Sequence, residues 1–163
     1  MRHTIYKIFF SFIMFFFVAN VVAQDKTVIL FEDFEDGIPS EWVQKQIFGD
    51  YKWVVESGNL TNPSGVKSGS KRIAFRNEGN QTTANVTRLI LPQLDLSKVF
   101  QPILCFSYAQ EKWADDFDTL KVLYRRTPTS NWMTLKTYDA YTSGWQNDTI
   151  RLAGATSTYQ LAF

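Results

Sequence analysis

The chain has 163 residues, with 17 lysines and arginines against 16 aspartates and glutamates. This near balance gives no excess of positive charge that would attract nucleic acid or anionic lipid, so no nucleic-acid partner is expected. A single cysteine, Cys105, excludes an internal disulfide.

The first segment is typical of a secretory signal peptide. Arg2 and Lys7 precede the apolar run IFFSFIMFFFVANVV, and Ala23 stands before Gln24. The run is shorter than the ~20 residues that a membrane-spanning helix needs. We predict a signal peptide over residues 1–23, a secreted or cell-surface location, and no membrane span in the mature chain.

Removing this segment also removes His3, which is the one histidine of the sequence. Residues 24–163 therefore contain no histidine. Catalysis by Ser-His-Asp or Cys-His groups and zinc sites with histidine ligands are excluded for the mature chain.

From Gln24 onward, apolar residues recur at every second position and turn-forming clusters separate the runs, which is typical of β-strands. No segment has a helical period. The predicted strands cover residues 26–35, 51–57, 71–77, 85–94, 103–110, 118–126, 132–140, 145–153 and 158–163. We predict an all-β fold, an antiparallel sandwich in one domain over residues 24–163.

The last predicted strand, TYQLAF, alternates well and ends at Phe163 without a closing turn. We expect the domain to be incomplete at its C-terminus.

Four acidic residues surround Phe34 in the stretch FEDFEDGIPSEW. On a strand, Phe34 would face the core, while Asp33 and Glu35 would share the opposite face. Two such carboxylates repel each other unless a cation, a basic group or a proton intervenes. The stretch is therefore a candidate for a catalytic pair, a cation site or a charged strand rim.

A second acidic cluster, with Asp116 and Asp118, precedes the strand that begins near Leu120. Carboxylates and loop carbonyls are the ligands that Ca²⁺ prefers, so the two clusters together could form a calcium site. The alternative is a solvated acidic turn. A glycosidase would use Asp33 and Glu35 as acid and nucleophile, but their position beside a Gly-Ile-Pro turn argues against catalysis.

Two further side chains are expected to differ in their exposure. Trp113 stands in the polar run EKWADD, so we expect it to be exposed and to bind a sugar or a protein partner. Cys105 stands in ILCFSY, and we expect a buried thiol on a strand.

Several motifs then follow one another in a specific order. They are FEDFEDGIPSEW, YKWVVESG, GSKRIAFRN, RLILPQLDLSKVFQPILCFSY, DTLKVLYRR and YQLAF. In this order they resemble the cleaved-adhesin or choice-of-anchor J domain. This MAM-like jelly roll occurs in Bacteroidetes surface proteins and in the haemagglutinin-adhesin regions of gingipains. The resemblance covers most of the mature chain.

The resemblance implies a calcium-stabilised jelly-roll sandwich. Carried to this sequence, it implies metal ligands at Asp33, Glu35, Asp116, Asp118 and Asn77. The family closes with a further strand bearing an acidic motif, which this sequence lacks, so the resemblance implies a missing last strand and an open sheet edge.

The favoured function is an exported, non-catalytic adhesion or binding module that recognises a protein or glycan of a host or neighbouring cell. Three alternatives stay open: a carboxylate-dependent glycosidase, an accessory domain of a secreted hydrolase, and a structural stalk without a ligand.

Overall fold

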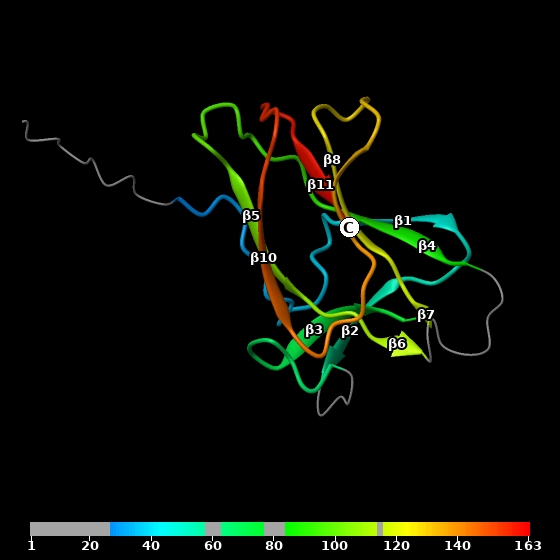
Figure 1. Ribbon diagram of the computed structural model, residues 1–163. Coiled ribbons are helices and arrows are strands. Elements are labelled where there is room, and N and C mark those ends of the chain that lie inside the picture. Colours follow the sequence, from blue (N-terminus) through cyan, green and yellow to red (C-terminus); the bar gives the residue numbers. More distant parts are fainter. Residues whose placement is uncertain (1–26, 58–62, 77–83, 114–115) are drawn as a thin grey trace, which may run out of the picture.

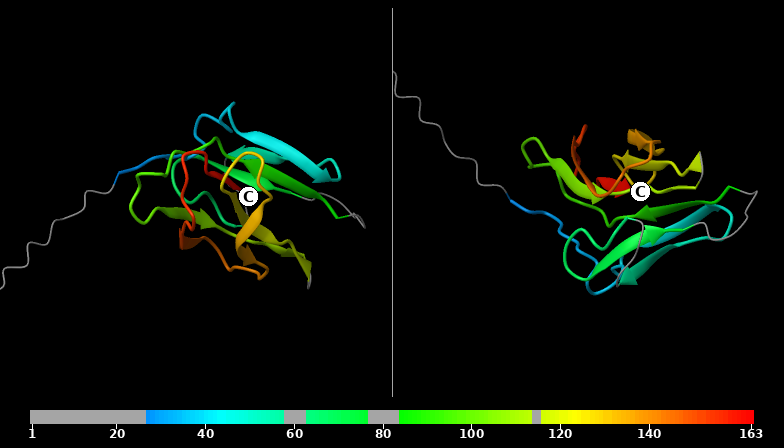
Figure 2. Two further views of the ribbon diagram at one scale, coloured as in Figure 1. Left: turned by 90° about the horizontal axis from the view of Figure 1, so that it is seen from above. Right: turned by 60° about the horizontal axis from the view of Figure 1, so that its bottom comes forward.

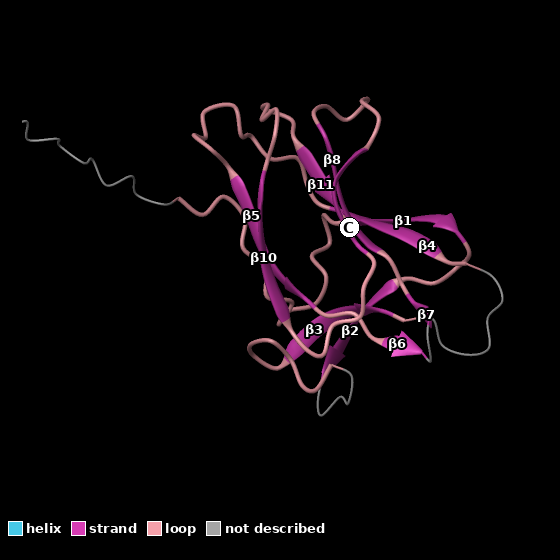
Figure 3. Cartoon of the chain, viewed as in Figure 1, coloured by secondary structure: helices cyan, strands magenta, loops and turns pink. Residues whose placement is uncertain are grey.

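The computed structural model describes residues 27–57, 63–76, 84–113 and 116–163, so the predicted signal peptide lies outside the described part. The ordered elements are strands, and no helix occurs among the described residues (Figure 3). Every pair of neighbouring strands in these residues is antiparallel. The prediction of an all-β, antiparallel, sandwich-like fold is confirmed.

Every predicted strand from residue 51 onward contains an observed strand, because apolar side chains at alternate positions can face a core from one side of a sheet. The observed strands are β1 (Val43–Phe48), β2 (Trp53–Ser57), β3 (Lys71–Phe75), β4 (Val86–Ile90), β5 (Ile103–Tyr108), β6 (Lys112–Trp113), β7 (Asp116–Phe117), β8 (Leu120–Arg125), β9 (Met133–Tyr138), β10 (Gln146–Arg151) and β11 (Gln160–Ala162).

One five-stranded sheet and three two-stranded sheets arise from these strands. The large sheet has the order β1-β4-β11-β8-β9, and the small sheets are β10-β5, β2-β3 and β6-β7. Figure 1 shows β5 and β10 side by side at one end, and β2 and β3 together at the bottom. Seen from above (Figure 2, left), β1 and β4 lie on one side of the molecule, and β5 and β10 on the other.

The last predicted strand lies in the middle of the large sheet. β11 pairs with β4 on one side and with β8 on the other. The Leu89 amide donates to the Phe163 carbonyl at 2.8 Å, and the Phe163 amide donates to the Leu89 carbonyl at 2.9 Å. Its residues are buried because both neighbours and the core cover them. β11 is therefore a central strand, and the open edges of the described sheets lie elsewhere.

The predicted strand over residues 26–35 is wrong, because its described part, from Thr27 to Glu35, is not a strand. Phe34 has a positive φ of 64°, and the amide of Gly37 donates to its carbonyl at 3.1 Å. This turn ends the alternation of faces that the strand prediction assumed. The Phe34 ring still packs edge-on against buried Trp42, with 5.7 Å between ring centroids, so its predicted place against the core is confirmed.

The core lies between the inner face of the large sheet and the segments that cover it. Its buried members are Trp42, Leu89, Leu91, Leu96, Leu152, Tyr159 and Leu161. They come from β4, β11 and the connections around them, which are far apart in the sequence. This is the pattern of a sandwich core, which forms only when distant strands pair.

β1 was not predicted, because its side chains are mostly exposed and show no apolar alternation. Its place depends on pairing with β4 and on one side-chain amide. Gln44 Nε2 donates to the Trp53 carbonyl at 3.0 Å, and the Trp53 amide donates to Gln44 Oε1 at 2.9 Å. These two bonds have the pattern of one hydrogen-bonded pair in an antiparallel sheet. They join the edge of the large sheet to the start of β2.

A polar contact joins β9 of the large sheet to β10. Lys136 Nζ donates to Asp148 Oδ2 at 2.5 Å, and the Tyr138 hydroxyl donates to the same oxygen. The bond from Lys136 and then the bond from Tyr138 lower the pKa of Asp148 from its ordinary value of 3.8 to about 2. The ionised form of Asp148 thus stabilises the folded chain.

We predict that Asp148→Asn lowers the melting temperature near neutral pH and loses this effect at low pH. Because the folded pKa lies below the ordinary value, the stabilisation is present above about pH 4 and is lost as the pH falls toward about 2. Thermal melts of both proteins across this range measure it. If the parent protein and Asp148→Asn differed in melting temperature by the same amount at low and at neutral pH, the role of the charge would be contradicted.

Candidate functional site

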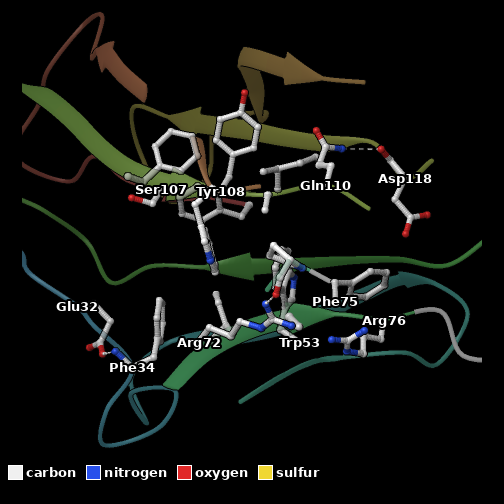
Figure 4. Close-up of a pocket in the computed structure, with 18 of the residues that line it drawn as sticks. Glu32, Phe34, Trp53, Arg72, Phe75, Arg76, Ser107, Tyr108, Gln110 and Asp118 are labelled. Atoms are coloured by element: carbon white, nitrogen blue, oxygen red, sulfur yellow. Dashed lines mark hydrogen bonds between the residues drawn. The ribbon is translucent and has the colours of Figure 1, made fainter. Parts of the chain in front are cut away.

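A groove of about 350 Å³ lies between β3 and β5. Figure 4 shows Ser107 and Tyr108 of β5 on one side, and Arg72 and Phe75 of β3 on the other. We call this hollow the β3–β5 groove. Its volume lies within the range of about 300–1,000 Å³ that is usual for ligand pockets.

Apolar and aromatic side chains form the inner surface of the β3–β5 groove. Leu91 and Trp42 belong to the core of the large sheet and also line the groove. Phe106 of β5 packs edge-on against Tyr138 and Phe163, with centroid distances of 5.8 and 5.5 Å. The groove thus reaches the hydrophobic core, so an apolar ligand group placed there would be removed from water.

Arg72 fixes the β3 wall. Its side chain is only 4% exposed, and its Nη1 donates to the carbonyls of Pro63 and Gly65 at 2.8 and 3.0 Å. Its Nε pairs with Glu56 of β2 at 3.2 Å. The guanidinium also lies 6.0 Å from the ring centroid of Trp145, which lines the groove just before β10. Arg72 therefore joins β3 to β2, to the preceding loop and to the approach to β10.

Charged and polar groups stand around the apolar surface. Glu32, Glu111 and Asp118 line the groove, together with Arg72 and the buried Gln110. Gln110 Nε2 donates to the Asp118 carbonyl at 2.6 Å (Figure 4). An apolar centre with a few polar groups at its margin is the usual composition of a binding site.

The main chains of β3 and β5 border the groove. Among the described residues, β3 is paired only with β2, and β5 only with β10. The groove is lined along both β3 and β5, whereas no residue of β10 lines it. Each border is therefore the edge strand of a two-stranded sheet within the described residues.

Asp33 and Glu35 lie outside the β3–β5 groove. Glu35 Oε1 accepts from the amides of Ser70 and Lys71 at 2.7 and 2.8 Å, and Glu35 Oε2 accepts from the Ser70 hydroxyl at 2.5 Å. These hydrogen bonds, with that from the Ser70 hydroxyl largest, lower the pKa of Glu35 below its ordinary value of 4.5. Asp33 Oδ1 accepts from the Glu35 amide at 3.1 Å. Asp33 therefore stabilises the turn, and Glu35 joins the turn to the start of β3.

The predicted calcium ligands are placed only in part. Asp118 lines the groove, whereas Asp33 and Glu35 do not. Asn77 lies outside the described residues, as does the side chain of Asp116. Within the described ranges, no three carboxylate, cysteine or histidine side chains gather into a group that could hold a metal ion. Structural calcium stays a prediction.

The predicted ligand-binding Trp113 forms the end of the short strand β6, and its side chain lies outside the described part of the structure. The prediction of a buried Cys105 is wrong, because Cys105 is exposed. Leu104 and Phe106 face the core side of β5, so alternation turns Cys105 to the other face. The apolar neighbours in the sequence concealed this.

Sequence reasoning missed the groove, although it found the strands that border it. The alternating pattern of ILCFSY and KRIAF shows which side chains face inward, but it does not show which strand lies beside which. The one feature of the sequence that pointed to an open sheet edge was the predicted absence of a closing strand. The position of the groove between β3 and β5 depends on the pairing of distant segments.

Comparisons with known protein families, with curated proteins and with solved structures find no match to this chain. Among the described residues, no helix is long and apolar enough to cross a membrane. The functional assignment therefore depends on the groove and on the sequence.

Proposed function

We propose that the mature chain is an exported, non-catalytic binding module, and that the β3–β5 groove is its recognition surface for a protein of a host or neighbouring cell. The observation that supports this most is the groove itself, an apolar hollow of about 350 Å³ between two strand edges. The predicted signal peptide supports export.

Two observations favour binding over catalysis. Residues 24–163 contain no histidine. The two carboxylates proposed for a glycosidase, Asp33 and Glu35, do not line the groove, and Glu35 accepts hydrogen bonds from Ser70 and Lys71 through both of its oxygens. A glycosidase needs two carboxyl groups that face the substrate from a common cleft.

We propose a relationship to MAM-like jelly rolls, which rests on the order of the sequence motifs. We propose that β10-β5 and β3-β2 are two halves of a second sheet, which faces the sheet β1-β4-β11-β8-β9 across the core. The motif order that resembles the cleaved-adhesin domain agrees with this arrangement. Adhesion is the role that the resemblance favours.

Leu30 offers a direct test, because it lines the groove and is 37% exposed. We expect Leu30→Glu to reduce binding to a panel of purified extracellular matrix proteins, since it places a charge beside the apolar surface. Val28→Glu is the matched control, because Val28 is 72% exposed, lies two residues away and does not line the groove. Surface plasmon resonance measures the binding.

Loss of matrix-protein binding in Leu30→Glu alone would support the groove as the recognition surface. Equal binding by both variants, or no binding by the parent protein, would contradict it. A glycan array probed with the parent protein and both variants tests the glycan alternative. If the ligand is a carbohydrate, the parent protein should bind glycans on the array and should not bind the matrix proteins.

The predicted structural calcium has its own test. If calcium binds the folded chain only, EDTA should lower the melting temperature and added calcium should restore it. The stabilisation amounts to about 2.7 kcal/mol when free calcium is about 100 times its dissociation constant. Asp118→Asn should reduce the response. A melting curve that EDTA leaves unchanged would refute the prediction.

A further inference from the structure

We propose that Arg88, Arg125 and Trp132 form a second binding site, on the face of the five-stranded sheet that points away from the core, and that this site takes an acidic segment of a partner protein. None of these three residues lines the β3–β5 groove. The inference therefore goes beyond the proposed function and does not depend on the groove.

Alternation along the strands places both arginines on the outer face of the large sheet. Leu89 of β4 belongs to the core cluster, and Tyr124 of β8 packs against it. Successive side chains of a strand point to opposite faces, so Arg88 and Arg125 point away from the core. Their strands lie in the same sheet, on either side of β11 (Figure 1).

The two guanidinium groups meet at one indole ring. Arg88 Cζ lies 5.1 Å and Arg125 Cζ lies 4.6 Å from the ring centroid of Trp132. Gln160, which is 8% exposed, holds Arg125 in place, because its Oε1 accepts from Arg125 Nε and Nη2 at 2.8 and 2.5 Å. Its Nε2 donates to the Leu91 carbonyl at 3.2 Å. The site is therefore anchored to the main chain of β4.

The positive charge of the two arginines is not neutralised within the described residues. Neither of them forms an ion pair there with a carboxylate. Arg88 Nε is buried in the described structure without a hydrogen-bond partner. Burial, and then the charge of Arg125, lower the pKa of Arg88 below its ordinary value. Like charges at this distance destabilise each other, and a carboxylate bound by both would offset that repulsion.

The rest of the sheet adds to this positive charge. The five strands contain no aspartate or glutamate, and their cations are Lys45, Arg88, Lys121, Arg125 and Lys136. Lys136 pairs with Asp148 of β10. Lys45 lies directly opposite Arg88 in the antiparallel register, so the two side chains share a face. The outer face is therefore complementary to a ligand with several negative charges, although the whole chain is nearly balanced.

Exposed apolar side chains on the same face favour a polypeptide over a polysaccharide. Val86 stands two residues before Arg88, and Phe48 lies opposite Val86 in the register. These two side chains are 49% and 54% exposed. Aromatic residues and arginine are enriched where proteins bind one another. An acidic segment that also carries an apolar residue would cover Phe48 and Val86 while its carboxylates meet the arginines.

The probe is a short fluorescein-labelled peptide of glutamate and serine with a central leucine. We expect it to bind the mature chain in a fluorescence anisotropy titration at low ionic strength. Binding should be lost at about 1 M salt, where the screening length falls to about 3 Å. A peptide with glutamine in place of every glutamate is the matched control and should not bind. In a heteronuclear NMR spectrum, the indole N–H signal of Trp132 should shift, whereas that of Trp145, which lines the groove, should not.

Two charge-neutralising variants test the site. Arg88→Gln removes one guanidinium together with its repulsion from Arg125, so we expect the fold to be retained and peptide binding to weaken at least about tenfold. Lys45→Gln changes an exposed side chain opposite Arg88, and should weaken binding by about threefold without disturbing packed groups. Arg151→Gln is the matched control, because it makes the same change of charge at an exposed position of β10 and should leave binding within about twofold.

Phe48→Ser tests the apolar part of the surface. We expect it to weaken binding of the leucine-containing peptide, and to leave unchanged the binding of a peptide with alanine in place of the leucine. Urea titrations of all variants measure their folding. An equal effect of Phe48→Ser on both peptides would show that the leucine does not contact Phe48, and would overturn the apolar contact.

The remaining outcomes decide the ligand and the place of the site. No binding of the acidic peptide, or equal binding by the Arg88, Lys45 and Arg151 variants, would overturn the inference. If a heparin oligosaccharide or a single-stranded DNA shifts the Trp132 signal and the acidic peptide does not, the partner is not a protein. Leu30→Glu should leave peptide binding unchanged, and a loss of binding in that variant would assign the peptide to the β3–β5 groove instead.

Discussion

Arg72→Leu is expected to lower the free energy of unfolding by about 3 kcal/mol. Arg72 is 4% exposed, and the leucine would leave the carbonyls of Pro63 and Gly65 without this donor. Glu56 would keep the hydrogen bond from Arg76 Nη2, at 2.9 Å, but would lose its ion pair with Arg72. For a domain of this size the melting temperature should fall by about 6–12 °C.

Arg151→Leu is the matched control, because Arg151 is exposed and its Nη2 donates to Gln101 Oε1 at 2.9 Å. We expect a change of less than about 0.5 kcal/mol. Denaturant unfolding of both variants measures the difference. Similar losses in the two proteins would show that Arg72 does not anchor the β3 wall.

Leu89→Ala is the second large expected effect, a loss of about 2–5 kcal/mol. Leu89 is fully buried in β4, and its main chain bonds to Phe163 of the chain segment that continues β11. Removing most of its side chain would leave a cavity in the core cluster, at the strand that joins β1 to β11. Leu89 is one of the largest fully buried side chains of the described residues.

Val86→Ala tests the same strand at its exposed end, since Val86 is 49% exposed. We expect a loss below about 1 kcal/mol, because little apolar surface is buried there. The free energies of unfolding from urea titrations compare the two variants. A loss at Leu89 no larger than that at Val86 would contradict the position of the core.

The two stability predictions bear on the binding site through different parts of the fold. Arg72 fixes the β3 border of the β3–β5 groove, while Leu89 packs with Leu91 and Trp42, which line its inner surface. A groove that holds its shape without a bound partner needs both. Preorganised borders reduce the entropy that a ligand must lose on binding.

The sequence by itself determined the class of fold and the places of most strands. Segments such as LKVLYR and QLA alternate or concentrate apolar side chains, and a strand has only two faces, so the pattern fixes which residues face the core. Residue types alone also excluded an internal disulfide and, for residues 24–163, histidine chemistry. These conclusions need no knowledge of which segments meet.

The tertiary structure decided where the chain departs from local pattern. Glu32 Oε1 accepts from the amide of Phe34 at 2.6 Å, and Phe34 adopts a positive φ, so the first acidic stretch is a turn. The Glu35 carboxylate accepts hydrogen bonds from Ser70, which lies 35 residues later at the start of β3. No periodicity in residues 26–35 encodes that contact, because it exists only once the chain has folded.

The β3–β5 groove depends even more on long-range pairing. β5 pairs with β10, which follows about 40 residues later, and β3 pairs with β2. The groove lies between these two pairs of strands, and the local sequence of neither pair predicts it. Alternation tells how a strand is oriented toward a core, but strand order is set by the summed burial and hydrogen bonding of the whole sheet. The sequence therefore determined the strands and their inward faces, and the tertiary structure alone decided which of the described strands pair with one another.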